Sequence, residues 1–208
     1  MTGQTAAQDP NEQFELFDAP GSLGLIELGS ISGTGRLCAR QKAHADGLWH
    51  RSVGVWLFNS KGRVLLQKRS PEKDTFPSRL DISVGGHIDG LNGCPFDALK
   101  RECYEELSLD ITSLSPSFVC VVAEETSGKT GQGLSFTDRE FKYIYACLID
   151  ESIFEIKPNL AEVSGILWQH YSQALDPTRP SDDLYVPRSV HERIAVIQFI
   201  EKSLRGAP

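Results

Sequence analysis

The stretch Gly85–Leu109, GGHIDGLNGCPFDALKRECYEELSL, decides the fold. It places a glycine pair and a short polar loop directly before a segment with helical periodicity, Pro95–Leu107. That segment carries three carboxylates within five residues, on Glu102, Glu105 and Glu106. Oxygen ligands of this kind suit a hard cation such as Mg²⁺. The stretch therefore predicts a metal site beside a glycine turn, where a diphosphate could bind.

The helical periodicity places these carboxylates at the edge of the buried surface. Each residue of a helix turns about 100° from the last, so Phe96, Leu99, Cys103 and Leu107 form one apolar stripe. The three glutamates lie together beside that stripe, and Arg101 stands four residues before Glu105, where it can tether it. A solvated face with ordinary charge pairs is the alternative. The strand, glycine pair and loop before the helix favour the metal site.

The rest of the chain alternates between apolar runs and turns. Ser52–Phe58 indicates a strand buried on both faces, and a turn at Asn59–Gly62 joins it to Arg63–Arg69 as a hairpin. Residues 21–35 are rich in Gly and Ser and are predicted to be loop-prone, with one apolar interruption at residues 23–28. Further strands are predicted at Phe14–Asp18, Leu80–Val84, Ser117–Ala123, Phe141–Ile149 and Gly165–His170, with a closing amphipathic helix at 189–204. The sum is one mixed α/β (α+β) domain with a helix on each face of a sheet.

Composition bounds the class of protein. The 208 residues carry a net charge of −7 and no stretch basic enough to indicate a nucleic-acid polymer as partner. No apolar segment approaches the roughly 18 residues of a membrane span, and the polar N-terminus does not resemble a signal peptide. The five cysteines are an odd number without a CxxC pair, which favours a reduced, cytoplasmic protein. We expect a disordered leader at 1–13 and a single domain at 14–208.

The decisive stretch resembles the signature of the Nudix family, Gly-x5-Glu-x7-Arg-Glu-U-x-Glu-Glu-x-Gly-U, where U is aliphatic. The matching residues, in order, are Gly86, Arg101, Glu102, Cys103, Glu105, Glu106 and Leu109. Two departures stand out. The loop is one residue longer, with Asn92-Gly93 at the first glutamate, and Ser108 replaces the second glycine. Asp89 is a candidate substitute for that glutamate, which mainly supports the loop in this family.

The resemblance, which extends from about residue 37 to residue 200, implies a fold and a reaction. The fold is an α/β/α sandwich with a mixed β-sheet between helices, and the reaction is hydrolysis of a diphosphate linked to another moiety. The expected cofactor is Mg²⁺, with Mn²⁺ as an alternative, held by Glu102, Glu105, Glu106 and the carbonyl of Gly86. The candidate bases are Glu105, Glu106 and Glu140. Arg69, Lys73 and His87 are the expected substrate contacts.

We call the segment that matches the signature, Gly86–Leu109, the box, and its helical part, Pro95–Leu107, the box helix. The sequence around the box is similar to the subgroup that includes isopentenyl-diphosphate isomerase. In that enzyme three histidines and two acidic residues hold a metal, and these positions fall on His44, His50, His87, Asp138 and Glu140. Whether His44, His50 and Asp138 form a second metal site stays open. The position of the isomerase's catalytic cysteine is Gly85, so no thiol is available for proton transfer.

A hydrolase is accordingly favoured over an isomerase, which typically keeps only the last glutamate of the box. A non-catalytic ligand-binding module is the third reading, which Asn92 and Ser108 leave open. The expected partner is a small diphosphate compound, such as a nucleoside diphosphate, with no nucleic-acid polymer and no membrane. A homodimer is compatible with the resemblance. Selectivity is expected in 21–48 and 126–138, and His170 and His191 are expected to lie outside the site.

Overall fold

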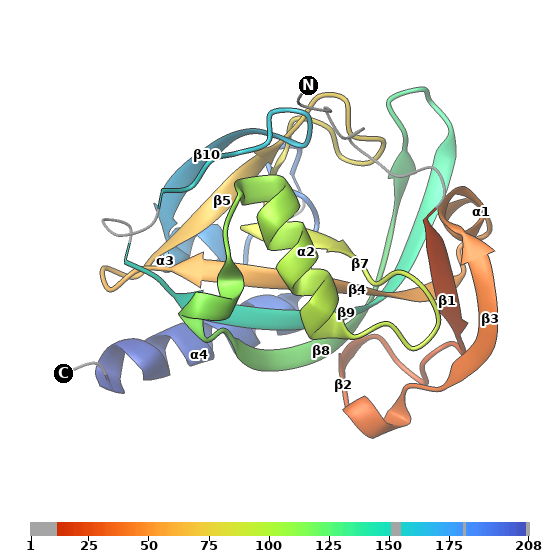
Figure 1. The fold of residues 1–208 in the computed structure, drawn as a ribbon, viewed down its shortest axis with the longest axis horizontal. Coiled ribbons are helices and arrows are strands. Elements are labelled where there is room, and N and C mark those ends of the chain that lie inside the picture. Colours follow the sequence, from red (N-terminus) through yellow and green to blue (C-terminus); the bar gives the residue numbers. More distant parts are fainter. Residues whose placement is uncertain (1–11, 151–154, 181, 207–208) are drawn as a thin grey trace.

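The computed structural model describes residues 12–150, 155–180 and 182–206. Its centre is an eight-stranded mixed sheet (Figure 1). The order of the main strands is β10 (Val163–His170), β5 (Arg63–Arg69), β4 (Trp49–Phe58), β9 (Ser135–Leu148), β8 (Ser117–Lys129) and β2 (Gly24–Ile26). The long strands β4 and β9 pair in parallel, whereas β8 and β9 form an antiparallel hairpin. The predicted 1–13 leader lies outside the described residues, apart from Glu12 and Gln13.

The sheet opens between β4 and β5, and this opening positions the glycine pair. The two strands pair only at Phe58 and Val64, next to the turn in which Asn59 Oδ1 accepts hydrogen bonds from the amides of Lys61 and Arg63. Farther from the turn, β4 pairs with β7 (Val84–His87) and β5 pairs with β6 (Leu80–Asp81). The segment from β6 to β7 therefore fills the opening, and Gly85-Gly86 lies in the middle of the fold.

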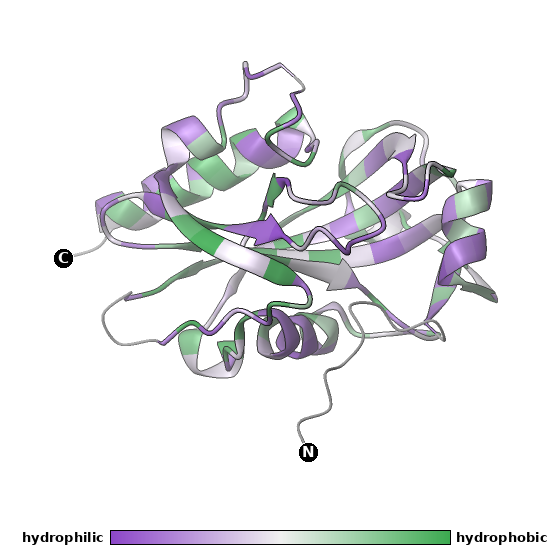
Figure 2. Ribbon diagram, turned by 90° about the horizontal axis from the view of Figure 1, so that it is seen from above, coloured by the Kyte–Doolittle hydropathy of each residue, from purple (hydrophilic) through white to green (hydrophobic). Residues whose placement is uncertain are grey.

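Two helices cover the two faces of the sheet, as Figure 2 shows from above. The side chains of β4 alternate, so that Val53, Val55 and Leu57 pack in one core while Trp56 and Phe58 pack in another. Helix α2 (Pro95–Leu107) contributes Leu99, Cys103 and Leu107 to the first core, and helix α4 (Val190–Gly206) contributes Val196 and Ile200 to the second. The predicted α/β/α sandwich is confirmed.

Helix α2 begins and ends where its sequence predicts. Pro95 occupies its first turn, where the missing N–H costs no hydrogen bond. At its end, Ser108 adopts a left-handed conformation with φ 53°, and the amide of Leu109 donates to the carbonyl of Cys103 at 3.1 Å. This is the C-terminal cap that glycine usually forms, because other residues are strained in it by about 1–2 kcal/mol. Ser108 therefore fulfils the role of the second glycine at some cost in stability.

The N-terminal region is more structured than its composition predicts. β1 (Gln13–Phe17) pairs with β3 (Gly33–Ala39), which leads into α1 (Arg40–Asp46). Within the loop-prone stretch 21–35, β2 lies in the apolar interruption at 23–28, and the 3₁₀ turn Leu28–Ser30 and the start of β3 are further structure that the composition does not predict. β2 forms because it pairs with β8, a contact that local composition does not reveal. The remaining short elements are the 3₁₀ turn Ile111–Leu114 and α3 (Tyr171–Ala174).

Within the described ranges, no helix combines the length and apolar character that crossing a bilayer requires.

Candidate active site

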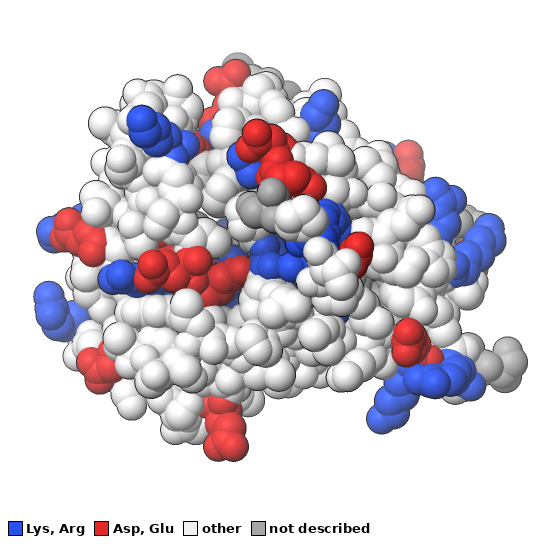
Figure 3. Space-filling model, turned by 180° about the vertical axis from the view of Figure 1, so that it is seen from behind, with Lys and Arg blue, Asp and Glu red and all other residues white. Residues whose placement is uncertain are grey.

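A cleft of about 540 Å³ opens beside the glycine pair. The box helix, residues 52–54 of β4 and residues 138–144 of β9 line it. Most of the predicted site residues line it: Arg69, Lys73, Gly86, His87, Arg101, Glu102, Glu105 and Glu140. Glu106 is not part of the lining, because it lies 1% exposed in the wall. On the face shown in Figure 3, acidic and basic side chains lie side by side across the middle and form no broad patch of one sign.

Glu102 and Glu106 project from α2 into the interior beneath β7. Glu106 Oε2 accepts hydrogen bonds from Gln67 Nε2 at 2.8 Å and from the amide of Gly85 at 3.3 Å. Burial raises the pKa of Glu106 to about 7, although Lys73 Nζ, 3.8 Å away, lowers it in part. Burial also raises the pKa of Glu102 well above its ordinary range, despite nearby Arg101. Two buried carboxylates under mutual repulsion form a donor set that fits a hard divalent cation.

The absence of a side chain at Gly86 lets Glu102 reach the glycine turn. A Cβ built on Gly86 would lie 2.0 Å from Glu102 Cδ and from its Oε1. Such a distance is well inside van der Waals contact, so the carboxylate occupies the space that any other residue's side chain would fill. The box helix and the glycine turn are thereby in direct contact.

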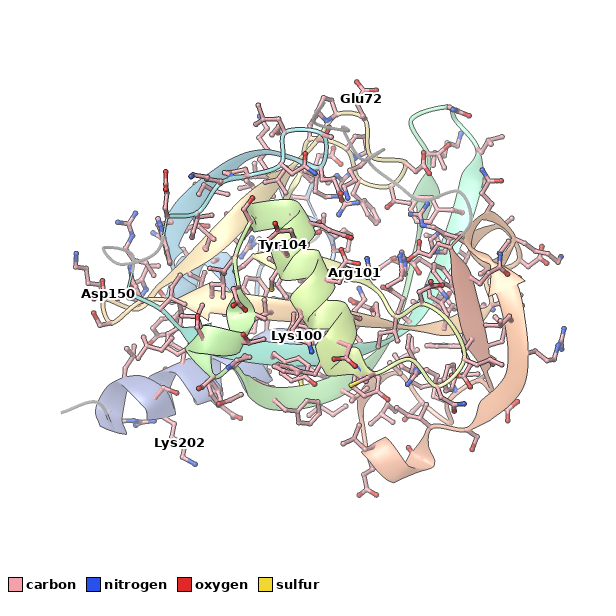
Figure 4. The ribbon with its side chains drawn as sticks, in the orientation of Figure 1. Glu72, Lys100, Arg101, Tyr104, Asp150 and Lys202 are labelled. Atoms are coloured by element: carbon pink, nitrogen blue, oxygen red, sulfur yellow. The ribbon has the colours of Figure 1, made fainter. Side chains whose placement is uncertain are left out.

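Arg101 ties the acidic residues of α2 to β7. Its guanidinium lies 3.0 Å from Glu105 and 2.9 Å from Glu102, and it donates to the carbonyl of His87 at 3.0 Å. Figure 4 shows Arg101 at the edge of α2 toward β7, whereas Tyr104 lies on the outer surface of the helix. Glu105 is the most accessible of the three glutamates, with its side chain 41% exposed.

Arg69 and Lys73, the two side chains expected to bind phosphate, are held in place by hydrogen bonds and ion pairs with neighbouring residues. Arg69 donates to the carbonyl of Thr75 at 3.0 and 3.2 Å and to Asp81 at 3.1 Å. Lys73 Nζ lies 2.8 Å from Glu162 and points toward Glu106. Both side chains line the cleft, and these contacts leave them little freedom.

A second group of metal-type ligands lies at the cleft, which His44, His87 and Asp138 line. Ligand atoms of His44, His50, His87 and Asp138 all lie within 4.8 Å of one another. Nε2 of His44, Nε2 of His50 and Oδ1 of Asp138 are buried without a hydrogen-bond partner. We call these four residues the histidine cluster. The sequence left its existence open, and the structure assembles it.

The three histidines of the cluster are in the neutral form that metal binding needs, whereas burial and nearby Glu140 raise the pKa of Asp138 well above its ordinary range, so a metal must displace a proton there. Burial, with help from His50, lowers the pKa of His44 to about 3, and burial lowers the pKa values of His50 and His87 as well. His50 Nδ1 lies 2.9 Å from the carbonyl of Leu48, to which it donates in its neutral form. Its Nε2 lone pair then faces the cluster. The buried atoms without partners and the neutral rings fit a divalent transition metal.

Glu140 stands beside the histidine cluster. Its carboxylate lies 3.8 Å from His87 Nε2 and 3.1 Å from Lys142 Nζ, which also lies 2.7 Å from Glu124. Burial raises the pKa of Glu140, but the Lys142 ammonium beside it outweighs burial and brings the pKa to about 2. Glu140 is therefore ionised at neutral pH. Glu124 and the buried position of Lys142 are not predictable from local sequence, because both follow from the pairing of β8 with β9.

Two histidines, His170 and His191, are not part of the described cleft lining, and Asp89 has a different role from the one expected. His170 accepts a hydrogen bond from the amide of Ser172 at the start of α3. His191 packs against Gly24, remote from the box. Asp89 accepts from the amide of Gln13 at 2.8 Å, so its carboxylate ties the box loop to β1 rather than bracing the loop internally.

Comparison with known proteins agrees with this geometry. The family model of the NUDIX domain matches residues 48–188. Nudix hydrolase 3 of Arabidopsis thaliana is 31% identical over 163 residues, which are 76% of this chain and 20% of that protein. The isopentenyl-diphosphate Delta-isomerase of Saccharopolyspora erythraea is 28% identical over 129 residues, 62% of each protein. The crystal structure of DR0079 from Deinococcus radiodurans superposes with a TM-score of 0.52 at 25% identity, covering 74% of this chain and 86% of that one.

The chain spans a fifth of the length of the Arabidopsis relative and about three fifths of that of the isomerase. The domain match nevertheless covers most of the chain. It contains the glycine turn, the box helix and the two basic residues at the cleft, Arg69 and Lys73. The chain belongs to the Nudix family.

Proposed function

We propose that the protein hydrolyses a diphosphate bond in a nucleoside diphosphate or another small organic diphosphate, with Mg²⁺ or Mn²⁺ as cofactor. The observation that carries this proposal is the meeting of Glu102 and Glu105 with Arg69 and Lys73 at one cleft, with Glu106 buried in the wall 3.8 Å from Lys73 Nζ. Carboxylates hold the cation and the two basic side chains face the same space, as binding of a metal-complexed diphosphate requires. Membership of the Nudix family supports the same reaction.

The box residues take distinct parts in the proposed site. Glu102, Glu105 and Glu106 would hold the cation, together with the backbone at Gly86, against which Glu102 packs. A divalent ion held there would lower the pKa of a bound water and neutralise charge on a leaving phosphate. Arg101 keeps Glu102 and Glu105 in place through its fixed guanidinium.

The cleft supplies the remaining roles. Arg69 and Lys73 would bind phosphate oxygens, and His87 would contact substrate or metal from β7. Glu105, Glu106 and Glu140 are the candidate bases that take a proton from water. Glu140 is ionised, whereas Glu106 exchanges its proton near neutral pH before a cation binds.

A second candidate is isomerisation of a prenyl diphosphate. The histidine cluster and the isomerase among the relatives favour it. However, Gly85 occupies the position at which the isomerase has its catalytic cysteine. The described part of the cleft lining contains no cysteine. Proton transfer at carbon needs a group of suitable pKa at that point. Hydrolysis, which needs only an activated water, is the reading that fits the residues present.

The test is a phosphate-release screen on the full chain with Mg²⁺, with Mn²⁺ and with chelator, with pyrophosphatase added to reveal diphosphate products. The panel contains nucleoside di- and triphosphates, ADP-ribose, dinucleoside polyphosphates, thiamine diphosphate and isopentenyl diphosphate. We expect metal-dependent turnover that Glu105→Gln and Glu106→Gln reduce and that Glu155→Gln, a change at an exposed surface glutamate, leaves intact.

Two results would count against the proposal. Full turnover in both box variants would show that the site is elsewhere. Conversion of isopentenyl to dimethylallyl diphosphate, detected by chromatography of the products, would favour the isomerase.

A further inference from the structure

The loop of the box cannot hold the carboxylate that the Nudix signature places in it. Asn92 adopts a left-handed conformation with φ 55°, which Asn tolerates and Glu does not favour. A Cβ on Gly93 would lie 2.5 Å from the carbonyl oxygen of Asp89 and 2.7 Å from Ile88 Cγ2. The longer loop therefore excludes a glutamate at Gly93 and strains one at Asn92.

A carboxylate from another part of the chain reaches the same loop. Glu15, on β1, accepts hydrogen bonds on Oε2 from the amide of Asn92 and from Arg51 Nη2, each at 3.0 Å. Glu15 is 7% exposed, so both bonds lie in a largely dry environment where an unpaired amide would be costly. An ion pair on the surface would contribute little, because water solvates both of its charges.

Backbone contacts hold the rest of the loop on β1. The amide of Gly90 donates to the carbonyl of Gln13 at 2.8 Å, and the amide of Gln13 donates to Asp89 Oδ1 at 2.8 Å. Phe14, between these contacts and Glu15, is fully buried, with its ring 4.5 Å from that of His50 and 4.4 Å from that of His87. β1 thus braces the box loop on one side and closes the histidine cluster on the other.

The braced loop sets the position of the box helix. Residues 88–94 join His87, at the end of β7, to Pro95, at the start of α2. The contact between Gly86 and Glu102 requires that β7 and α2 keep a fixed separation, since the two meet within van der Waals distance. A loop that moves would change the distance between the glycine turn and the carboxylates of the helix.

We propose that Glu15 is a positioning residue of the metal site, which replaces the missing carboxylate of the box loop from an N-terminal strand outside the matched domain. Glu15 touches neither metal nor substrate; it holds the Asn92 amide, and through the loop it fixes α2. The proposal rests on the proposed function in that the box carboxylates bind a divalent cation. It makes β1 part of the active site.

The test compares three variants of the full chain in two assays. Glu15→Ala removes the acceptor, Glu15→Gln keeps a neutral acceptor, and Thr34→Val is the matched control, because it breaks a hydrogen bond between β3 and the carbonyl of Leu16 without touching the loop. Hydrogen exchange of residues 88–94 measures the loop directly. Titration with Mn²⁺ alone, followed by electron paramagnetic resonance, measures the metal site, and thermal unfolding identifies any variant that does not fold.

We expect Glu15→Ala to speed exchange in 88–94 and to raise the Mn²⁺ dissociation constant roughly 10- to 100-fold, the usual effect of losing support for a metal ligand. Glu15→Gln should lie between Glu15→Ala and the wild type, and Thr34→Val should match the wild type in both assays. If Glu15→Ala does not fold, faster exchange in Glu15→Gln than in Thr34→Val supports the proposal.

Wild-type exchange in 88–94 and wild-type Mn²⁺ affinity in the folded Glu15 variants would overturn the proposal. The two proposals fail separately: a wild-type protein that binds no Mn²⁺ at the box contradicts the proposed function, while the exchange assay still reports whether Glu15 holds the loop.

Discussion

Replacement of Gly86 by alanine should remove one ligand from the metal site without unfolding the protein. The added Cβ would lie 2.0 Å from Glu102 Cδ, whereas ordinary van der Waals contact begins at 3.4 Å. The carboxylate must therefore retreat by about 1.4 Å. Mg²⁺–oxygen distances of about 2.0–2.1 Å tolerate deviations of only about 0.2 Å, so the retreat breaks the coordination. Because Glu102 Cδ is at the far end of a flexible side chain, the backbone need not move.

Gly85→Ala is the matched control for this change. A Cβ on Gly85 would meet Ile82 Cγ2 at 3.2 Å and the carbonyl oxygen of Val53 at 3.6 Å, which small shifts can accommodate. Mn²⁺ titration of both variants, with thermal unfolding alongside, separates the metal site from the fold. We expect the dissociation constant to rise at least about 10-fold in Gly86→Ala, equivalent to about 1.4 kcal/mol, and to change little in Gly85→Ala.

Equal Mn²⁺ affinities in Gly86→Ala and the wild type would refute this reasoning, since Glu102 would then not be a ligand. Equal losses in both alanine variants would mean that the turn tolerates no side chain at all, and that the contact with Glu102 is not the cause.

Three further predictions follow from the buried charges. Because burial raises the pKa of Glu106 to about 7, the stability that its protonated form contributes is present below its unfolded pKa of about 4.5 and is lost as pH rises through 7. Because the buried histidines titrate in the opposite sense, the comparison is with Glu106→Gln: the melting temperature of metal-free wild type relative to that of Glu106→Gln should fall from pH 5 to pH 8, and a constant difference would contradict this. Lys142→Met leaves Glu124 and Glu140 buried without their cation, and urea unfolding should show a loss of about 3–5 kcal/mol, against little change if the carboxylates are solvated. His50→Ala should abolish Co²⁺ binding at the histidine cluster, seen in the visible absorption spectrum, but leave Mn²⁺ binding at the box; an unchanged Co²⁺ spectrum would remove the cluster as a metal site.

Local signals predicted the central elements because they are short-range. Pro95–Leu107 is the observed α2, and the Asn59–Gly62 turn joins β4 to β5 as predicted, since a fixed helical period and a turn-forming Asn side chain determine each. Helices α2 and α4 lie on opposite faces of the sheet, as expected. The apolar run of β4 predicted a strand buried on both faces, and its alternating side chains fill both cores.

Contacts between distant parts of the chain escaped prediction. The sequence contains no sign that Glu15 would meet Asn92, 77 residues away. The segment 126–138 was expected to hold selectivity loops, but most of it forms the ends of β8 and β9, because cross-strand pairing outweighs its Gly content. The histidine cluster was suggested by resemblance alone, as its members lie on α1, β4, β7 and β9.

The central claim is that the box carboxylates bind the divalent cation, and the most direct measurement is an anomalous difference map from a crystal of the full chain soaked in Mn²⁺. The account predicts a peak among Glu102, Glu105 and Glu106, beside Gly86, whether or not the histidine cluster also binds an ion. A peak at the histidine cluster with none at the three glutamates would contradict it.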